Sequence, residues 1–501
     1  MVRRRWLWLC VVILAAGQAL AAGPGEAPTP AKSRQKPEAI KKVEKSDPAK
    51  QDDYELLRVF VDTLDQVQRN YVKEVDRREL VEAAIQGVLS KLDPYSSYVG
   101  PQEIDEFRAN VDNEFGGIGI QLDADNDGQL RVLSPMIGTP AYRAGVLAGD
   151  RIVDISGEST EGMHYDDAVK RLKGEPGTKV TLTVEHAATE EQQKVTLTRE
   201  MIHVETVLGD RRTADDKWDF MLDHEKRIGY IRLVAFSRET YRDLRKAMEE
   251  LRRAKLKGLI LDLRFNPGGL LNAAIEISGL FISKGRIVST AGRNSPERKW
   301  DAQSGDAFEG FPMVVLMNRY SASASEIVAA CLQDHKRAAI VGERSWGKGS
   351  VQNLIELDGG NSVLKLTTAS YKRPSGKNIH KFPDAKDTDE WGVTPDAGYE
   401  LKLSEREMYA LLSERRQRDV LQPHARAARA VSTSTTPGVK PAEKKPEKAV
   451  EKATGKPAVA IPDTPAATPL AAKAGDAKPT DRQLQMALTY LSAELVRAGK
   501  P

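Results

Sequence analysis

Apolar residues recur along the chain at two different spacings, and these spacings predict both helices and strands. A helical period is carried by the segments 54–71, 80–89 and 241–254. Short and nearly continuous apolar runs, which are typical of buried strands, occur at 228–234, 258–263 and 311–317. Because strands and helices alternate in the second half of the chain, we expect right-handed crossovers and an α/β fold with a mixed sheet.

Two stretches lack any apolar period. Residues 22–52 are rich in Pro, Lys, Ala and Glu, and residues 423–480 mix Pro, Ala, Lys and Thr, so both are predicted to be disordered linkers. Residues 481–498 then resume a helical period with leucines at 484, 488, 491 and 495. We expect a C-terminal amphipathic helix that docks on its own domain or on a partner subunit.

The N-terminus has the pattern of a secretory signal peptide over residues 1–21. Arg3, Arg4 and Arg5 precede an apolar run from Trp6 to Ala16, and a small-residue cleavage site follows at 19–21. We therefore expect an exported, periplasmic protein, anchored to the inner membrane only if the leader is not cleaved. The mature chain would keep Cys331 as its single cysteine, so no intramolecular disulfide is expected.

Composition and two incomplete motifs argue against nucleic acid, nucleotide and metal. The 501 residues carry 29% charged side chains but a net charge of only +3, which indicates no nucleic-acid partner. Residues 123–128 resemble the first half of a calcium loop, but the twelfth position is Ser134, where a glutamate is required, so we expect a hairpin. Residues 342–348 spell G-x-x-x-x-G-K without the Ser or Thr that should follow, so no nucleotide and no cofactor are predicted.

A cluster of small residues, Ser321-Ala-Ser-Ala-Ser325, lies where a predicted strand ends and a helix begins. The free N–H groups and positive dipole end of a helix can stabilise an oxyanion formed by a serine placed there. Taken singly, these serines are read most simply as helix caps or loop residues. Their pairing with Lys348, the one lysine of the glycine loop 342–349, is what suggests chemistry.

A serine nucleophile needs a base, and a lysine can serve if burial keeps its amine neutral. Of the seven histidines, only His335 falls near these segments, and it lies a few turns down the helix. Lowering the pKa of an amine from about 10.4 to roughly 7 costs about 4 to 5 kcal/mol of desolvation. The loop around Lys348 must therefore be closed and dry, which Trp346 and the neighbouring glycines could achieve.

The segments SASASEI and VGERSWGKGSVQ resemble the carboxyl-terminal processing, or tail-specific, serine peptidases, which use a Ser-Lys dyad. The resemblance implies that Ser323 is the nucleophile, Lys348 the general base and Gln352 the residue that positions it. Asp334 aligns with an aspartate that supports the site structurally. The peptidase core would span residues 201–415.

Two further segments extend the resemblance. In the family, the turn DLRFNPGG at 262–269 contributes one glycine N–H to the oxyanion hole, here Gly268 or Gly269, together with the N–H of Ala324. The sequence does not decide between the two glycines. The turn LDPYS at 92–96 looks like the N-terminal helical region of the family, here residues 53–106, and by itself is read as a scaffold without chemistry.

Residues 107–200 resemble a bacterial PDZ domain in two motifs, FGGIGI and TPAYRAGVLAGDRIVDISG. The bare glycine backbone can turn N–H groups toward a carboxylate, so that a peptide adds as an extra strand. A helix at 166–172 would form the other wall of the groove. The predicted peptide-binding residues are Phe115, Gly116, Gly117, Ile118, Gly119 and Ile120.

These features predict a mixed α/β peptidase core with an inserted PDZ domain and an N-terminal helical region. The expected function is a serine endopeptidase that recognises unstructured C-terminal tails through the PDZ domain and cleaves within the tail through an acyl-enzyme. The alternative is a catalytically inactive, exported PDZ scaffold that binds peptides. Besides protein C-termini as substrates, we expect a second copy of the chain or an adaptor protein as a partner.

Overall fold

The computed structural model describes residues 48–124, 128–303, 305, 307–421 and 480–499. The expected signal peptide, most of the linker 22–52 and nearly all of the linker 423–480 lie outside these ranges. Within them, no helix is both long enough and apolar enough to cross a membrane.

The second half of the chain is built on a mixed sheet with the strand order β10–β14–β15–β18–β19. The strands β14 (Ile228–Leu233), β15 (Gly258–Asp262), β18 (Met313–Met317) and β19 (Ala339–Gly342) run parallel. The short strands β10 (Val207–Leu208) and β13 (Met221–Asp223) pair antiparallel with β14. Parallel neighbours require helical crossovers, and the predicted α/β class is confirmed.

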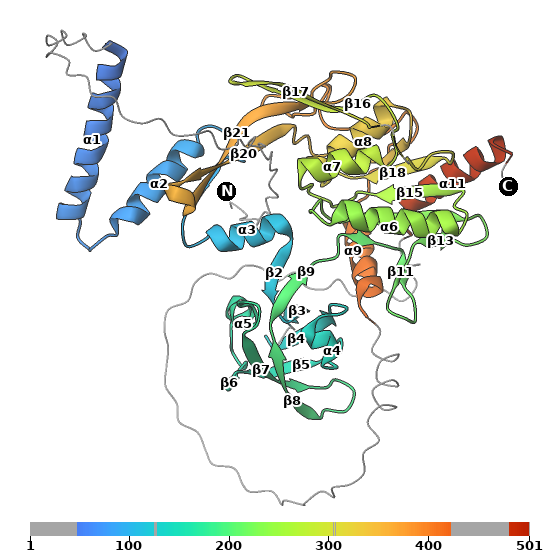
Figure 1. The fold of residues 1–501 in the computed structure, drawn as a ribbon, viewed down its shortest axis with the longest axis horizontal. Helices are drawn as coiled ribbons and strands as arrows, with labels where there is room; N and C mark the ends of the chain where they lie inside the picture. The colour runs from blue at the N-terminus through green and yellow to red at the C-terminus, as the bar shows by residue number, and fades with distance from the viewer. Residues whose placement is uncertain (1–47, 125–127, 304, 306, 422–479, 500–501) are drawn as a thin grey trace, which may run out of the picture.

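Both faces of this sheet are covered, because successive side chains of a strand point to opposite sides. On one face lie α6 (Thr240–Arg253), α7 (Leu271–Gly279) and α8 (Ala324–Asp334), which pack on residues such as Ile231 and Val315. On the other face α11 (Arg482–Arg497) packs Leu491 against Ile260 and Val314. The C-terminal helix thus docks on its own domain (Figure 1).

A second, antiparallel sheet stands beside the first and has the order β1–β21–β16–β17, with β20 also paired to β21. Its strands are β1 (Ser97–Val99), β16 (Arg286–Gly292), β17 (Ser295–Asp301), β20 (Ser350–Leu357) and β21 (Ser362–Lys372). The hairpin β20–β21 closes through a 3₁₀ turn, Asp358–Gly360. Because β1 comes from the N-terminal region, its pairing with β21 ties that region to the core.

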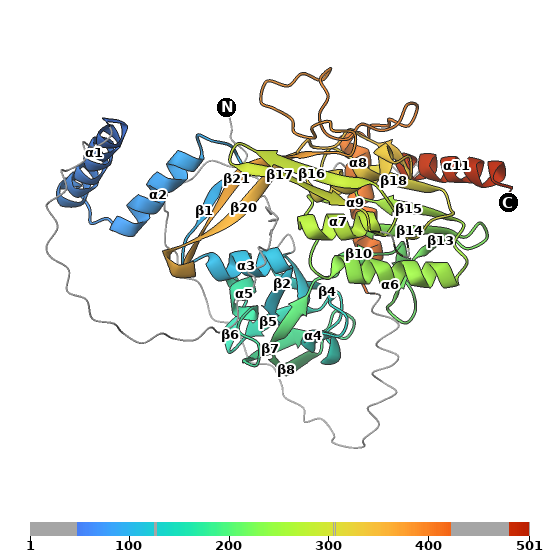
Figure 2. The same cartoon turned by 45° about the horizontal axis from the view of Figure 1, so that its top comes forward.

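The inserted domain has its own sheet and its own apolar core. The sheet has the order β3–β4–β5–β7–β8, and β6 pairs with β5. Its elements are β3 (Ile120–Ala124), β4 (Leu130–Pro135), α4 (Pro140–Arg143), β5 (Arg151–Ile155), β6 (Glu158–Ser159), α5 (Tyr165–Leu172), β7 (Lys179–Glu185) and β8 (Gln192–Thr198). A ribbon of β2 (Glu114–Gly117) and β9 (Glu200–His203) connects this domain to the rest (Figure 2).

The remaining elements frame the two sheets. The N-terminal helices are α1 (Pro48–Asn70), α2 (Arg77–Leu89) and α3 (Ile104–Asp112), and a ribbon of β11 (Arg211–Arg212) and β12 (Trp218–Asp219) lies near α9 (Glu405–Asp419). Asp76 caps α2 by accepting hydrogen bonds from the backbone N–H groups of Arg78 and Glu79. In both views α1 lies at the end of the molecule opposite α11, and it exposes large apolar side chains, Leu56 and Leu57 among them.

Candidate active site

Ser323 occupies the N-cap of α8, directly after the loop that leaves β18. Its backbone has φ 56° and ψ −114°, a combination that L-residues rarely adopt and that stores strain. The side chain is buried, and among the described residues the Oγ atom has no hydrogen-bond partner. A strained, buried hydroxyl without a partner is unusual in a folded protein and marks this residue as a functional candidate.

Glu326, in the first turn of α8, binds both Ser323 and the glycine loop 342–349, here called the lysine loop because it carries Lys348. Its fully buried carboxylate accepts backbone N–H bonds from Ser323 at 2.7 Å and Lys348 at 2.8 Å through Oε2. Through Oε1 it accepts from the backbone N–H of Gly347 and the hydroxyl of Ser345, both at 2.6 Å. One side chain therefore fixes the backbones of both residues that the sequence pattern pairs.

Burial raises the pKa of Glu326 to about 7, against the four hydrogen bonds from Ser345, Gly347, Ser323 and Lys348, each of which favours the ionised form. The sequence interpretation gave Glu326 no role, although the pattern S-x-x-E at a helix start was a usable signal for it. Its contact with the distant loop could not be read from that pattern.

Lys348 is nearly buried, with 8% of its surface exposed, and its Nζ atom lies 5.0 Å from the centroid of the Tyr95 ring. Tyr95 belongs to the turn between α2 and β1, and its hydroxyl accepts a hydrogen bond from Trp346 Nε1 at 3.3 Å. Asp93 shapes the turn by accepting from the backbone N–H groups of Tyr95 and Ser96. The turn that the sequence suggested to be a plain scaffold thus reaches the candidate base.

The structure bonds Gln352 and Asp334 to groups other than Ser323 and Lys348, and Asp334 lies at the opposite end of α8 from Ser323. The buried amide of Gln352 donates from Nε2 to Ser350 Oγ at 2.9 Å and to Thr367 Oγ1 at 3.2 Å. Asp334, the last residue of α8, binds the Arg373 side chain at 2.7 and 2.9 Å and the backbone N–H of Ser375. Burial would raise the pKa of Asp334, but these partners hold it below its ordinary value.

The glycine turn after β15 meets the start of α8 at Gly268. A Cβ atom placed on Gly268 would lie 2.8 Å from the backbone N of Ala324 and 2.8 Å from Ser323 Cβ, and its φ of 101° also favours glycine. The Gly268 N–H donates to Asn266 Oδ1 at 2.8 Å. Gly269 faces elsewhere, because a Cβ there would lie 2.1 Å from the carbonyl oxygen of Phe236. Of the two glycines, Gly268 is the one beside Ser323 and Ala324.

The inserted domain carries a groove of about 280 Å³ between β3 and α5. Its walls are mainly apolar and include Phe115, Ile118, Gly119, Ile120, Leu122, Met136, Tyr165, Val169 and Leu172, with Lys173 at one side. Four of the six predicted peptide-binding residues therefore line it. The other two, Gly116 and Gly117, pair with β9, and a Cβ on Gly116 would lie 2.2 Å from the carbonyl oxygen of Gly174.

No group of three or more His, Cys, Asp or Glu side chains in the described part of the chain is arranged to hold a metal ion. The segment that resembles half a calcium loop begins with the last two residues of β3, which pairs antiparallel with β4, and residues 125–127 lie outside the described ranges. Cys331 is buried in α8, and burial raises the pKa of its thiol to about 12.

Comparison with known proteins identifies the class. Three family models match the chain: "Peptidase family S41" over residues 227–398, "PDZ domain" over 131–186, and "Activating protease CtpB N-terminal domain" over 21–102. The matches to the peptidase family and to the PDZ domain define a serine-type peptidase that carries a PDZ domain.

The relatives narrow the class to one family. The chain is 41% identical over 361 residues to the carboxy-terminal-processing protease of Bartonella bacilliformis, covering 71% of this chain and 78% of that protein. It is 34% identical over 317 residues to the carboxy-terminal processing protease CtpB of Bacillus subtilis, covering 63% and 64%. The chain belongs to the carboxy-terminal processing proteases of peptidase family S41, as its motifs predicted.

Among solved structures, the photosystem II D1 C-terminal processing protease is 28% identical, with a TM-score of 0.38 and coverage of 69% of this chain and 92% of that chain. A PDZ domain of the carboxy-terminal protease from Vibrio cholerae in complex with a peptide is 31% identical, with a TM-score of 0.17 and coverage of 18% and 99%.

Proposed function

We propose that the chain is an exported endopeptidase that captures unstructured protein C-termini in its PDZ groove and cleaves within the tail by Ser-Lys catalysis. The observation that carries the proposal is the buried Glu326 carboxylate, which binds the backbone N–H groups of both Ser323 and Lys348. Two residues held by one carboxylate keep their relative backbone positions through the reaction. That arrangement is what a nucleophile and its base require.

In the proposed reaction, the neutral Lys348 amine takes the proton from Ser323 Oγ as that oxygen attacks the scissile carbonyl carbon. The N–H groups of Ala324 and of Gly268 or Gly269 stabilise the oxyanion, and the proximity of Gly268 to Ala324 favours Gly268. The lysine then protonates the leaving amine. Finally the lysine takes a proton from a water molecule as the water oxygen attacks the acyl-enzyme. It then gives this proton to the Ser323 oxygen as the ester bond breaks.

Side chains must rearrange before this reaction begins. Ser323 Oγ has no hydrogen-bond partner among the described residues, and Lys348 Nζ lies over the Tyr95 ring. The Gly268 N–H is bonded to the Asn266 side chain. Rotation of Lys348 toward Ser323 would form the dyad, and a small turn of the Gly268 peptide would direct its N–H to the substrate.

Tyr95 is proposed to keep water from Lys348, and Tyr95→Ala is expected to lower kcat/KM at pH 7.5 by about 10-fold or more. A ring face stabilises an ammonium by about 0.5–2 kcal/mol, whereas a neutral amine at this pH needs about 4 to 5 kcal/mol of desolvation. Loss of the water shield therefore outweighs loss of the ring attraction, and the acid limb of the pH–rate profile should move to higher pH.

Tyr95→Phe keeps the ring and should stay within about 3-fold of wild type, since the bond from Trp346 contributes only about 1 kcal/mol. Tyr98→Ala is the matched control, because Tyr98 is also partly buried and follows in the same segment. An unchanged pH–rate profile in Tyr95→Ala, or an equal change in Tyr98→Ala, would remove Tyr95 from the proposal.

We propose that the apolar groove between β3 and α5 binds the C-terminal tails of substrates. Val169→Glu, which puts a charge in the groove, is expected to lower kcat/KM for a tail reporter about 10-fold or more. Lys170→Glu, on the exposed side of the same helix, should have little effect. Amidation of the reporter's C-terminus should mimic Val169→Glu, and full activity on the amidated reporter would mean that the groove does not read the carboxylate.

Export is proposed from the arginines and the apolar run within residues 1–21, which lie outside the described ranges.

Besides its substrates, the chain is proposed to bind a second copy of itself or an adaptor protein. The exposed apolar side chains of α1 support such a partner, since large apolar groups on a helix surface commonly become covered in a complex.

A further inference from the structure

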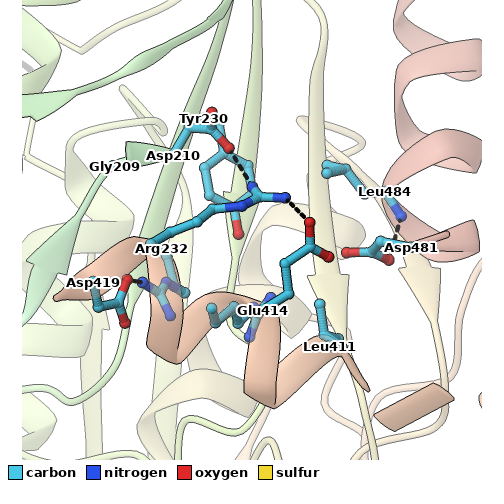
Figure 3. Close-up of a pocket in the computed structure, with 11 residues that line it drawn as sticks. Gly209, Asp210, Tyr230, Arg232, Leu411, Glu414, Asp419, Asp481 and Leu484 are labelled. Atoms are coloured by element: carbon cyan, nitrogen blue, oxygen red, sulfur yellow. Dashed lines mark hydrogen bonds and ion pairs between the residues drawn. The ribbon is translucent and has the colours of Figure 1, made fainter. Parts of the chain in front are cut away.

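The helix α11 is joined to the rest of the protein by a long stretch of chain and lies beyond the residues that the peptidase family model matches. It nevertheless buries Gln483, Ala487, Leu491 and Leu495 against the sheet. Its N-cap, Asp481, accepts a hydrogen bond from the backbone N–H of Leu484 at 3.0 Å. Figure 3 shows Asp481 and Leu484 beside Leu411 and Glu414 of α9, where a small cavity of about 30 Å³ separates the two helices from β14.

The first residues of α11 bind a buried arginine next to the glycine turn. Arg264 is inaccessible to solvent, and its Nη1 and Nη2 atoms each donate to one oxygen of Asp481 at 2.8 Å. Gln483 Oε1 accepts a third bond from Nη1 at 3.1 Å, while its Nε2 atom donates to the carbonyl of Leu401. A bidentate pair of this kind is strong and directional, and it places the guanidinium in one orientation.

Asp262 holds the same guanidinium from the other side. Its carboxylate accepts from Arg264 Nε at 3.1 Å and Nη2 at 2.7 Å, and it also pairs with Arg415 of α9 and accepts the Tyr230 hydroxyl at 2.7 Å. Burial would raise the pKa of Asp262, and the two arginines hold it well below its usual range. Removing one partner from such a cluster leaves a buried charge uncompensated, which is strongly unfavourable.

Asn266 follows Arg264 by two residues in the chain and binds both the glycine turn and the start of α8. The Asn266 side chain accepts from the Gly268 N–H at 2.8 Å and donates to the carbonyl of Leu233 at 2.8 Å. Its backbone carbonyl accepts from the N–H of Ala322 at 3.1 Å and from Ser325 Oγ at 3.0 Å. The bonds of Arg264 to α11, the short backbone segment 264–266 and the bonds of Asn266 thus connect α11 to Ala322 and Ser325, on either side of Ser323.

We propose that Asp481 and Gln483 are positioning residues for peptide hydrolysis, which act through Arg264 on the glycine turn 266–269 beside Ser323. The C-terminal helix is then part of the active enzyme, since without it Arg264 would lose three of its hydrogen bonds. This inference rests on the proposed Ser-Lys peptidase function. Loss of the Asp481 charge should slow the chemical step without weakening substrate binding.

The test compares Asp481→Asn with Leu495→Ala in the full chain. Asparagine caps a helix about as well as aspartate, so Asp481→Asn keeps the bond to Leu484 but loses the charge that faces Arg264. Leu495 packs on the sheet near the other end of the same helix, so Leu495→Ala weakens docking without touching Arg264. We expect Asp481→Asn to lower kcat about 10-fold or more with KM within about 2-fold. Leu495→Ala should lower Tm and leave kcat at 25 °C within about 2-fold.

A second measurement does not depend on activity. Hydrogen exchange of the amides at 264–270 should become faster in Asp481→Asn and stay as in wild type in Leu495→Ala. Wild-type kcat in Asp481→Asn, equal losses of kcat in both variants, or unchanged exchange at the glycine turn would each overturn the positioning role. A wild-type protein that shows no cleavage dependent on Ser323 would refute the proposed peptidase mechanism instead, and the exchange result would still decide whether Asp481 orders the turn.

Discussion

Replacing Ser323 with alanine in the full chain is expected to lower kcat on an unstructured reporter by about 10⁴-fold or more, because the attacking oxygen is lost. Lys348→Ala should cause a loss of similar size. The double variant should be no slower than either single variant, since a nucleophile and its base act as one unit. Single-turnover cleavage of a reporter with an apolar C-terminus, with the products identified by mass spectrometry, measures all three.

Two matched controls separate loss of chemistry from loss of structure. Ser404 caps α9 as Ser323 occupies the N-cap of α8, so Ser404→Ala should cost about 1 kcal/mol of stability and keep full activity. Lys381 lies next to the lysine loop, where its backbone N–H donates to the carbonyl of Gly347. Lys381→Ala should likewise remain active. Thermal unfolding of every variant checks that the fold persists.

The outcome also decides between the two functions that the sequence left open. Cleavage by the wild type that survives in Ser323→Ala and Lys348→Ala would mean that these residues do not carry the reaction. Tail binding by the wild type without any cleavage would instead favour the inactive PDZ scaffold. Cleavage that is lost in both variants, with tail binding retained, is the result that the Ser-Lys mechanism requires.

The elements of the core were predictable from sequence because their signals are local. Buried parallel strands need continuous apolar runs, and residues 228–233, 258–262 and 313–317 provide them within the expected ranges. The helix α6, predicted over 241–254, is observed at Thr240–Arg253. By contrast, the leucines of α11 predicted a helix but could not say which surface it covers, because docking depends on residues far away in the chain.

The difference between local signals and long-range contacts also explains which residues of the site the sequence did not reveal. Ser323 was placed at a helix start because small residues follow a strand there, and the structure puts it at that N-cap. The roles suggested here for Tyr95 and Asp481 depend on contacts with Lys348 and Arg264 across the fold, for which no local pattern exists. The strained backbone of Ser323 is also a tertiary effect, since residue type alone would favour an ordinary φ.

Glu326→Gln is expected to lower kcat by about 10²-fold or more. The carboxylate accepts two hydrogen bonds on each oxygen, from Ser323 and Lys348 on one and from Ser345 and Gly347 on the other. A glutamine can serve one pair through its carbonyl, but its NH₂ group must then face the other pair, which also donates. Either the backbones of Ser323 and Lys348 or the segment 345–347 would then be displaced. Displacements of about 1 Å at a catalytic pair can lower the rate 10²-fold.

In the wild type, both the free energy of unfolding and the activity should depend on pH through Glu326. Its pKa of about 7 in the folded chain lies above its ordinary value of 4.5, so between these pH values the folded state binds more protons than the unfolded state. The free energy of unfolding should therefore fall as pH rises through this window, by about 3 kcal/mol from this group. Activity should rise over the same window, because only the ionised carboxylate can accept all four bonds.

Glu326→Gln should lose this part of the pH dependence of Tm, and Glu343→Gln is the control. Glu343 is also a buried carboxylate and belongs to the loop 342–349 itself, but it accepts from the Arg319 side chain and from the backbone N–H of Leu403 instead. Its replacement should lower stability and leave the shape of the pH–rate profile as in wild type. A difference in unfolding free energy between wild type and Glu326→Gln that does not change from pH 5 to pH 8 would show that Glu326 does not titrate there. The acid limb of activity would then have to come from Lys348 alone.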